Sequence, residues 1–178
     1  MWLAIFVTGS MSHSIDHQHI KEVHAYAGLA LMAAQNFEMT LENILIMQRR
    51  LSNQNITLAE LESFEQGVQL KTLGSLLCEI RKQVSFGDGA EKMIIDAHKK
   101  RNFLAHRFFK QRVEEVFSEH GRNQMISELK ELLKSFENAD LIAVSIMNLI
   151  AKLLGITEER IGEELHKFKE SAKNWPSK

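Results

Sequence analysis

The sequence has few of the residues that break helices or cross-link chains. Its 178 residues include nine glycines, one proline (Pro176) and one cysteine (Cys78). So few chain breakers argue against a β-sandwich or barrel, which needs frequent turns. A single cysteine excludes an internal disulfide and a cysteine-rich metal site. Because Cys78 follows two leucines and is close to Ile80, we expect its thiol to be buried.

Neither sign of charge is in excess. The chain has 22 Lys and Arg residues against 23 Asp and Glu residues, a formal net charge of −1 at pH 7. No overall positive field attracts nucleic acid, so a nucleic-acid function would need a local basic site. Hydrophobic residues make up 44% of the chain, which is enough for the core of one domain and argues against intrinsic disorder.

Long hydrophobic runs are also lacking. The apolar stretch at residues 1–7 has no preceding Lys or Arg, and it is too short for a signal-peptide core or a membrane span. We therefore expect a cytoplasmic protein without membrane association. Residues 1–12 are expected to form an N-terminal tail, the alternative being a short ordered element that packs on the domain.

Apolar residues recur every three or four positions through most of the chain, which is the spacing of one helix face. This predicts helices over about residues 15–52, 57–84, 90–120, 123–154 and from 157 onward. Gly67 is a possible break in the second helix, Gly121 a C-terminal cap of the third, and Gly155 the end of the fourth. The expected fold is an all-α bundle of four to five long helices in one domain, 1–178, with a C-terminal helix and tail at 157–178.

Two polar groups on the first predicted helix are candidate sites. His13, His17 and His24 share one face, but no carboxylate or cysteine completes a ligand set, so a solvated helix start is favoured over a metal site. Gln35, Glu38 and Glu42 form a row beside the apolar stripe, which faces either water or a functional site. We expect no metal and no cofactor.

The strongest local signal lies in residues 99–109, where six of eleven residues are basic or amide-bearing: Lys99, Lys100, Arg101, Asn102, His106 and Arg107. On a helix, Asn102 and His106 are about 40° apart. Arg101 shares a stripe with Ile94, Ala97, Ala105 and Phe108. A guanidinium in an apolar stripe needs a partner, which would be either a structural carboxylate such as Glu38 or a ligand in a site.

The string Arg101-Asn102-x-x-x-His106 resembles the R-x4-6-H motif of the HEPN superfamily of small all-α proteins. Residues outside the string strengthen the resemblance: Gly28 to Leu31, Gln35 and Glu38 on the first helix, Phe108 after the motif, and Gly121-Arg122. The resemblance covers about residues 15–150. Phe108 stands where toxin members often carry a tyrosine.

The resemblance implies a metal-independent endoribonuclease in a defence or toxin–antitoxin setting. Two subunits would form a homodimer in which both motifs share one cleft. His106 would transfer protons, Arg101 would stabilise the phosphorane, and Asn102 would orient phosphate or His106. The row of Gln35, Glu38 and Glu42 would support the motif. RNA phosphates would contact a basic group comprising Lys99, Lys100, Arg107, Lys110 and Arg112.

Two alternatives remain open at the level of sequence. The same cleft in a non-catalytic module would bind a nucleotide, RNA or a partner protein. A structural helical adaptor would carry the motif by coincidence. An antitoxin or a nucleotidyltransferase is the partner that a toxin function implies.

Overall fold

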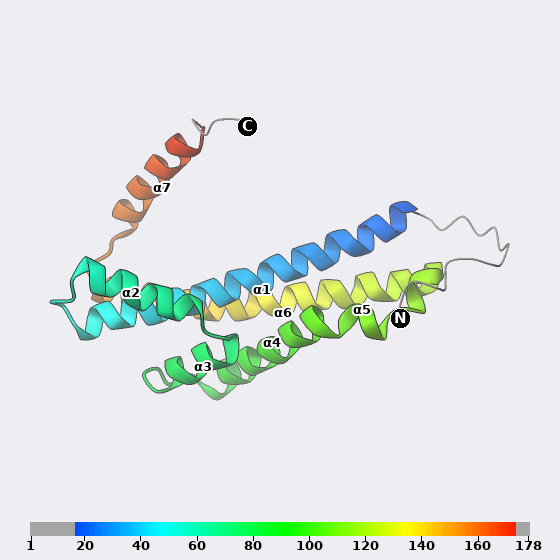
Figure 1. Cartoon of the computed structure of the whole chain (residues 1–178), viewed down its shortest axis with the longest axis horizontal. Coiled ribbons are helices and arrows are strands. Elements are labelled where there is room, and N and C mark those ends of the chain that lie inside the picture. The colour runs from blue at the N-terminus through cyan, green and yellow to red at the C-terminus, as the bar shows by residue number, and fades with distance from the viewer. Residues whose placement is uncertain (1–16, 174–178) are drawn as a thin grey trace.

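The computed structural model describes residues 17–173, and all regular structure in this range is helical. The predicted all-α class is therefore confirmed for the described residues. Figure 1 shows the elements in order: α1 (His17–Ser52), α2 (Leu58–Gln69), α3 (Leu73–Arg81), α4 (Asp88–His106), α5 (Phe108–Gln111), a 3-10 turn (Glu115–Phe117), α6 (Glu119–Leu153) and α7 (Glu158–Lys173). The N-terminal tail expected at 1–12 lies outside the described residues.

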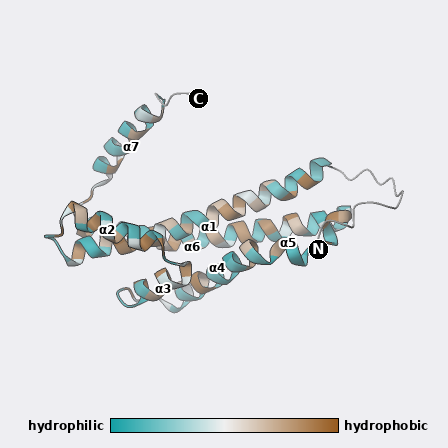
Figure 2. Ribbon diagram, viewed as in Figure 1, coloured by the Kyte–Doolittle hydropathy of each residue, from teal (hydrophilic) through white to brown (hydrophobic). Residues whose placement is uncertain are grey.

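The two longest helices, α1 and α6, lie side by side and run in the same direction (Figure 1). Lys130 of α6 lies over the ring of Tyr26, 4.6 Å from its centroid. Further along both helices, the Thr40 hydroxyl donates a 2.7 Å hydrogen bond to Asp140. The residue numbers of the two contacts rise together, as a parallel pair requires. Figure 2 shows hydrophobic and hydrophilic residues alternating along both helices, which is the pattern of an amphipathic pair.

Helix α4 runs opposite to α1 and α6 and completes the core. Arg101 of α4 meets Glu38 of α1, whereas His24, near the start of α1, stacks on Phe109 beyond the end of α4. Fully buried side chains come from these three helices, from α5 and from α2 and α3: Phe37, Leu41, Val68, Leu76, Ile80, Ile94, Ala97, Phe108, Leu129 and Phe136. The core therefore lies between α1, α4 and α6, and α2 and α3, which connect α1 to α4, also contribute to it.

The second predicted helix, 57–84, is divided, but not at Gly67. The capping box at its start is confirmed, with Thr57 and Glu60 each accepting from the other's backbone N–H. The break instead falls after Gln69, and Thr72 caps α3 by accepting from the Ser75 N–H at 3.3 Å. Val68 and Leu73 are both buried. On one continuous helix, residues five apart would lie about 140° apart, so the break lets both side chains face the core.

The prediction that Gly121 ends a helix is wrong. Gly121 lies in the first turn of α6, where Ser118 caps the helix by accepting from its N–H at 3.0 Å. A Cβ atom at Gly121 would collide with the backbone of Glu115 in the preceding 3-10 turn. Glycine is needed here because two backbone segments touch, and not because a helix ends. Gly155, with φ of 71°, does end α6 as predicted.

The expected burial of Cys78 is also wrong, because its side chain is exposed. The buried positions of α3 are Leu73, Leu76, Leu77 and Ile80. These four residues form one helical face, and Cys78 lies outside it. Among the described helices, none combines the length and the apolar content that a membrane crossing requires.

Replacing Gly121 with alanine tests the close backbone contact. We expect Gly121→Ala to lower the free energy of unfolding by about 1–3 kcal/mol, because the added methyl group forces the 3-10 turn away from α6. Gly67→Ala is the matched control. It adds a methyl group within α2 where nothing lies within 4 Å, so it should raise stability by about 0.5–1 kcal/mol. Urea denaturation measures both changes, and equal effects would contradict the contact.

Candidate functional site

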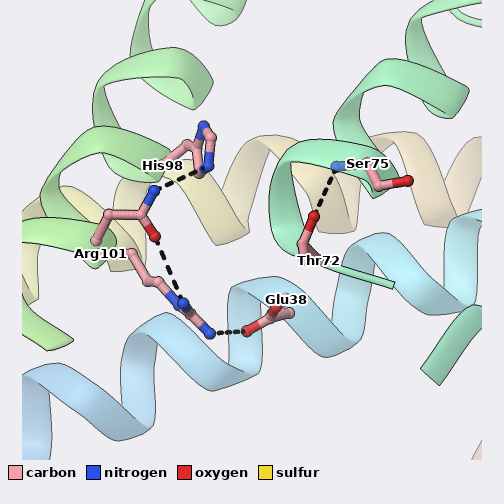
Figure 3. Close-up of polar contacts among 6 residues, drawn as sticks. Glu38, Thr72, Ser75, His98 and Arg101 are labelled. Atoms are coloured by element: carbon pink, nitrogen blue, oxygen red, sulfur yellow. Dashed lines mark hydrogen bonds and ion pairs between the residues drawn. The ribbon is translucent and has the colours of Figure 1, made fainter. Parts of the chain in front are cut away.

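The motif predicted from the sequence lies on α4, at the edge facing α1. The Arg101 guanidinium reaches across to Glu38 of α1, with Nη2 3.1 Å from Oε2 (Figure 3). The two side chains are only 30% and 18% exposed. The partner that a guanidinium beside an apolar stripe requires is therefore Glu38, one of the row predicted to support the motif.

A second histidine, His98, joins the motif through Asn102. Arg101 Nη1 donates to Asn102 Oδ1 at 3.5 Å, and the Asn102 amide nitrogen lies 3.2 Å from His98 Nε2. With its oxygen accepting from Arg101, Asn102 has its amide nitrogen left to donate. His98 Nε2 must then be an acceptor, so the imidazole is neutral with its proton on Nδ1. Hydrogen bonds thus link four side chains in the order Glu38, Arg101, Asn102 and His98, with Arg101 donating to both of its neighbours.

The surroundings of His98 favour the neutral ring. Burial lowers the pKa of His98 below 6.5, the positive charges of Arg101 and Arg81 lower it further, and Glu38 opposes them. The imidazole Cε1 lies 3.2 Å from the position of a Cβ atom on Gly74, so the absence of a side chain there lets the ring lie against α3. His98 is not among the residues predicted from the sequence, although it lies four residues before Asn102, on the same helical face.

The polar row on α1 divides into an exposed and a half-buried part. Gln35 is exposed, whereas Glu38 and Glu42 are half-buried. Burial raises the pKa of Glu42, and the negative charges of Glu38 and Glu65 add to the effect. Glu38 is thus the member of the row that contacts the motif through an ion pair.

His106 is the last residue of α4, and its side chain is exposed. From helix geometry it lies about 20° from Lys99 and about 40° from Asn102, but about 140° from Arg101. The amide of Asn102 is directed to His98 and not to His106. The structure therefore fixes Arg101 and Asn102 in one network and leaves the His106 imidazole facing solvent.

The predicted RNA-binding residues fall into two groups. Lys100 forms a 2.7 Å ion pair with Asp96 and donates to Ser135 of α6. Arg112 donates two 3.0 Å hydrogen bonds to Glu128. These two cations therefore have structural partners. The other three are exposed to solvent: Lys99, Arg107 and Lys110.

The predicted apolar stripe through Arg101 is correct except at Ala105. Ile94, Ala97 and Phe108 are fully buried, but Ala105 is exposed and Leu104 takes its place in the core. The face of α4 that carries Leu104 packs into the core. Arg101 and Ala105, about 40° apart around the helix axis, therefore lie at the rim of the interface with α1. A small exposed residue next to Arg101 leaves room for another chain.

The N-terminal histidines do not form a cluster in the described residues. His13 lies outside them, and His24 packs its ring on Phe109 with the centroids 5.7 Å apart. Within residues 17–173, no group of three His, Cys, Asp or Glu side chains is placed to hold a metal ion.

Comparison of the chain with family models, curated proteins and solved structures finds no match. The functional interpretation therefore depends on the motif and on the geometry around it.

Titration of His98 tests its environment. A base whose pKa is lowered on folding takes up a proton more readily in the unfolded chain, so the free energy of unfolding should fall as the pH drops below 6.5. His98→Gln keeps an acceptor for Asn102 but does not titrate, so its stability should fall less over the same pH range. The matched control is His166→Gln, on exposed α7. Superimposable stability profiles of wild type and His98→Gln would contradict the shift.

Proposed function

We propose that this chain is a metal-independent endoribonuclease of HEPN type that acts as a homodimer in a defence or toxin–antitoxin setting. The observation that supports the proposal is that α4 carries both a fixed polar group and an exposed histidine. Arg101 and Asn102 are held by hydrogen bonds to Glu38 and His98, whereas His106 stands free at the surface beside Lys99. Phosphodiester transfer needs both a fixed cationic group and an accessible imidazole. Because Arg101 and His106 of one chain lie about 140° apart on α4, the cleft between two subunits would have to bring them together.

The chemistry follows from the nucleophile that RNA itself provides. The ribose 2′-oxygen attacks the adjacent phosphorus, the bond to the 5′-oxygen breaks, and a 2′,3′-cyclic phosphate and a 5′-hydroxyl result. One proton leaves the 2′-oxygen and one reaches the leaving oxygen. In a two-fold cleft, one His106 would accept the first proton and its symmetry mate would donate the second, since an imidazole can act as either a general base or a general acid.

Arg101 would stabilise the negative charge of the phosphorane. Glu38 and Asn102 engage one nitrogen each, and the remaining donors of the planar guanidinium are left for phosphate oxygens. Lys99, Arg107 and Lys110, all exposed, would hold the backbone on either side. This is a local basic surface on a chain whose formal net charge is −1.

Apolar exposure beside the motif supports the homodimer. Helix α1, whose Glu38 pairs with Arg101, also carries three exposed apolar side chains, Leu31, Met32 and Met39, which are 41%, 54% and 54% exposed. An isologous interface over this surface would bring the two copies of α4 together and bury apolar area.

Removal of the His106 ring is the direct test. His106→Ala should lower the rate of RNA cleavage by roughly 10²–10⁴-fold. Its stability should change by less than about 1 kcal/mol because the side chain is exposed. Cleavage of total RNA is measured in EDTA, where the wild type should remain active. His166→Ala, an equally exposed histidine on α7, should cleave normally. Wild-type cleavage by His106→Ala would remove His106 from the mechanism.

The dimer is tested at Ala105. A single-chain mass of 20.4 kDa at micromolar concentration would contradict the dimer. Ala105→Glu adds a charge beside Arg101 at an exposed position, so the variant should stay folded. It should lose cleavage and also the dimer formed through the surface around Arg101 and Ala105, the motif-face dimer. Ala59→Glu, at an exposed position of α2, is the control and should associate and cleave as the wild type does. Light scattering gives the mass in each case: Ala105→Glu should have a smaller mass than the wild type, and Ala59→Glu the same mass as the wild type.

A non-catalytic module is the second candidate, and two observations favour it. Phe108 supplies no hydroxyl, and it is fully buried. The Arg101 guanidinium is already neutralised by Glu38. Such a module would bind RNA with an affinity that falls with salt but would leave it intact, and the same incubation with total RNA separates the two functions.

A further inference from the structure

The last helix, α7, lies apart from the bundle and presents an apolar stripe to solvent. Figure 1 shows it projecting away from the bundle near the end where α1 and α6 finish. Its stripe consists of Ile161, Leu165, Phe168 and Ala172, and the first three are 49%, 49% and 72% exposed. A helix of 16 residues has little stability alone in water, so this face needs a partner.

The stripe has the spacing of a coiled-coil seam. Its residues are separated by four, three and four positions, which assigns Ile161 and Phe168 to d positions of a heptad and Leu165 and Ala172 to a positions. A hollow of about 820 Å³ joins the stripe to Leu154 and Ile156, and Arg50, Arg160 and Glu164 also line it. The surface therefore suits another helix lying along α7.

The charges beside the stripe identify the partner and its direction. Glu164 falls at a g position and Lys169, five residues later, at an e position. In a parallel pair of identical helices, g of one chain faces e five residues later in the other, so two Glu–Lys pairs form across the seam. In an antiparallel pair, g faces g and e faces e. Glu164 would then lie near Ser171, and Lys169 near Gly162, without ion pairs.

We propose that α7 pairs with α7 of a second copy of this chain as a parallel, two-fold coiled coil. The remaining charges lie outside the seam except Glu158, which falls at an a position where α7 begins. Glu159, Glu163 and Glu170 occupy b and f positions, which point away from the seam. Like charges there are separated by more than the width of the seam and are screened at physiological ionic strength. Lys167 lies at c and is satisfied by Glu164 of its own helix, at 2.7 Å.

This contact is separate from the motif. His106 lies at the end of α4 where α1 begins, whereas α7 extends from the opposite end of the bundle (Figure 1). The pairing of α7 therefore does not depend on ribonuclease activity or on the motif-face dimer.

Disulfide trapping in the full-length chain tests both the contact and its direction. In a Cys78→Ser background, Ile161→Cys and Ala172→Cys are made separately and oxidised with diamide. In the parallel pair each residue faces its own copy, so each variant should cross-link with itself. Glu163→Cys, on the outer side of α7, is the control and should not. Circular dichroism checks that every variant stays helical.

Charge reversal gives an independent readout. Glu164→Lys in the Ile161→Cys chain places two lysines across the seam and should reduce cross-linking, and adding Lys169→Glu should restore it. An Ile161→Cys chain that links only to an Ala172→Cys chain would show an antiparallel pair and overturn the proposal. Absence of cross-links in both single variants would overturn the pairing altogether.

Discussion

The parallel packing of α1 against α6 is the constraint from which the rest of the structure follows. Because α1 and α6 run in the same direction, the chain must return between them, and α4 is the returning segment. Since α4 must cover the apolar faces of both long helices, its register is set by Ile94 and Ala97, both fully buried. That register brings Arg101 to the rim of the core, opposite Glu38.

The donor and acceptor roles in the polar network at this rim are fixed, because the role of each side chain determines the role of the next. Glu38 is acceptor-only and Arg101 donor-only, so the orientation of Asn102 is set by the guanidinium and the tautomer of His98 by Asn102. Because Gly74 has no side chain, the edge of the His98 imidazole lies against α3. Three helices, α1, α3 and α4, thus converge on one small group of residues, although only the Arg101–Asn102 pair is contiguous in the chain.

The helical class, the capping box at Thr57 and the end of α6 at Gly155 could be predicted because each depends on residues close in sequence. The partner of Arg101 could be anticipated because a guanidinium beside a core requires a carboxylate. Cys78 and Gly121 were misjudged because their environments depend on which face of α3 packs inward and on how closely the 3-10 turn approaches α6. His98 was missed because its role exists only once Asn102 is oriented by Arg101.

The parallel topology also has a kinetic consequence. Thr40 and Asp140, which join α1 to α6, are 100 residues apart. Closing so long a loop raises the contact order above that of a simple up-and-down bundle and slows folding. At a synthesis rate of about 5–20 residues per second, α1 leaves the ribosome about 5–20 s before its partner. During that interval α2, α3 and then α4 are the helices available to cover it, and the part of its apolar stripe that packs on α6 stays accessible to chaperones.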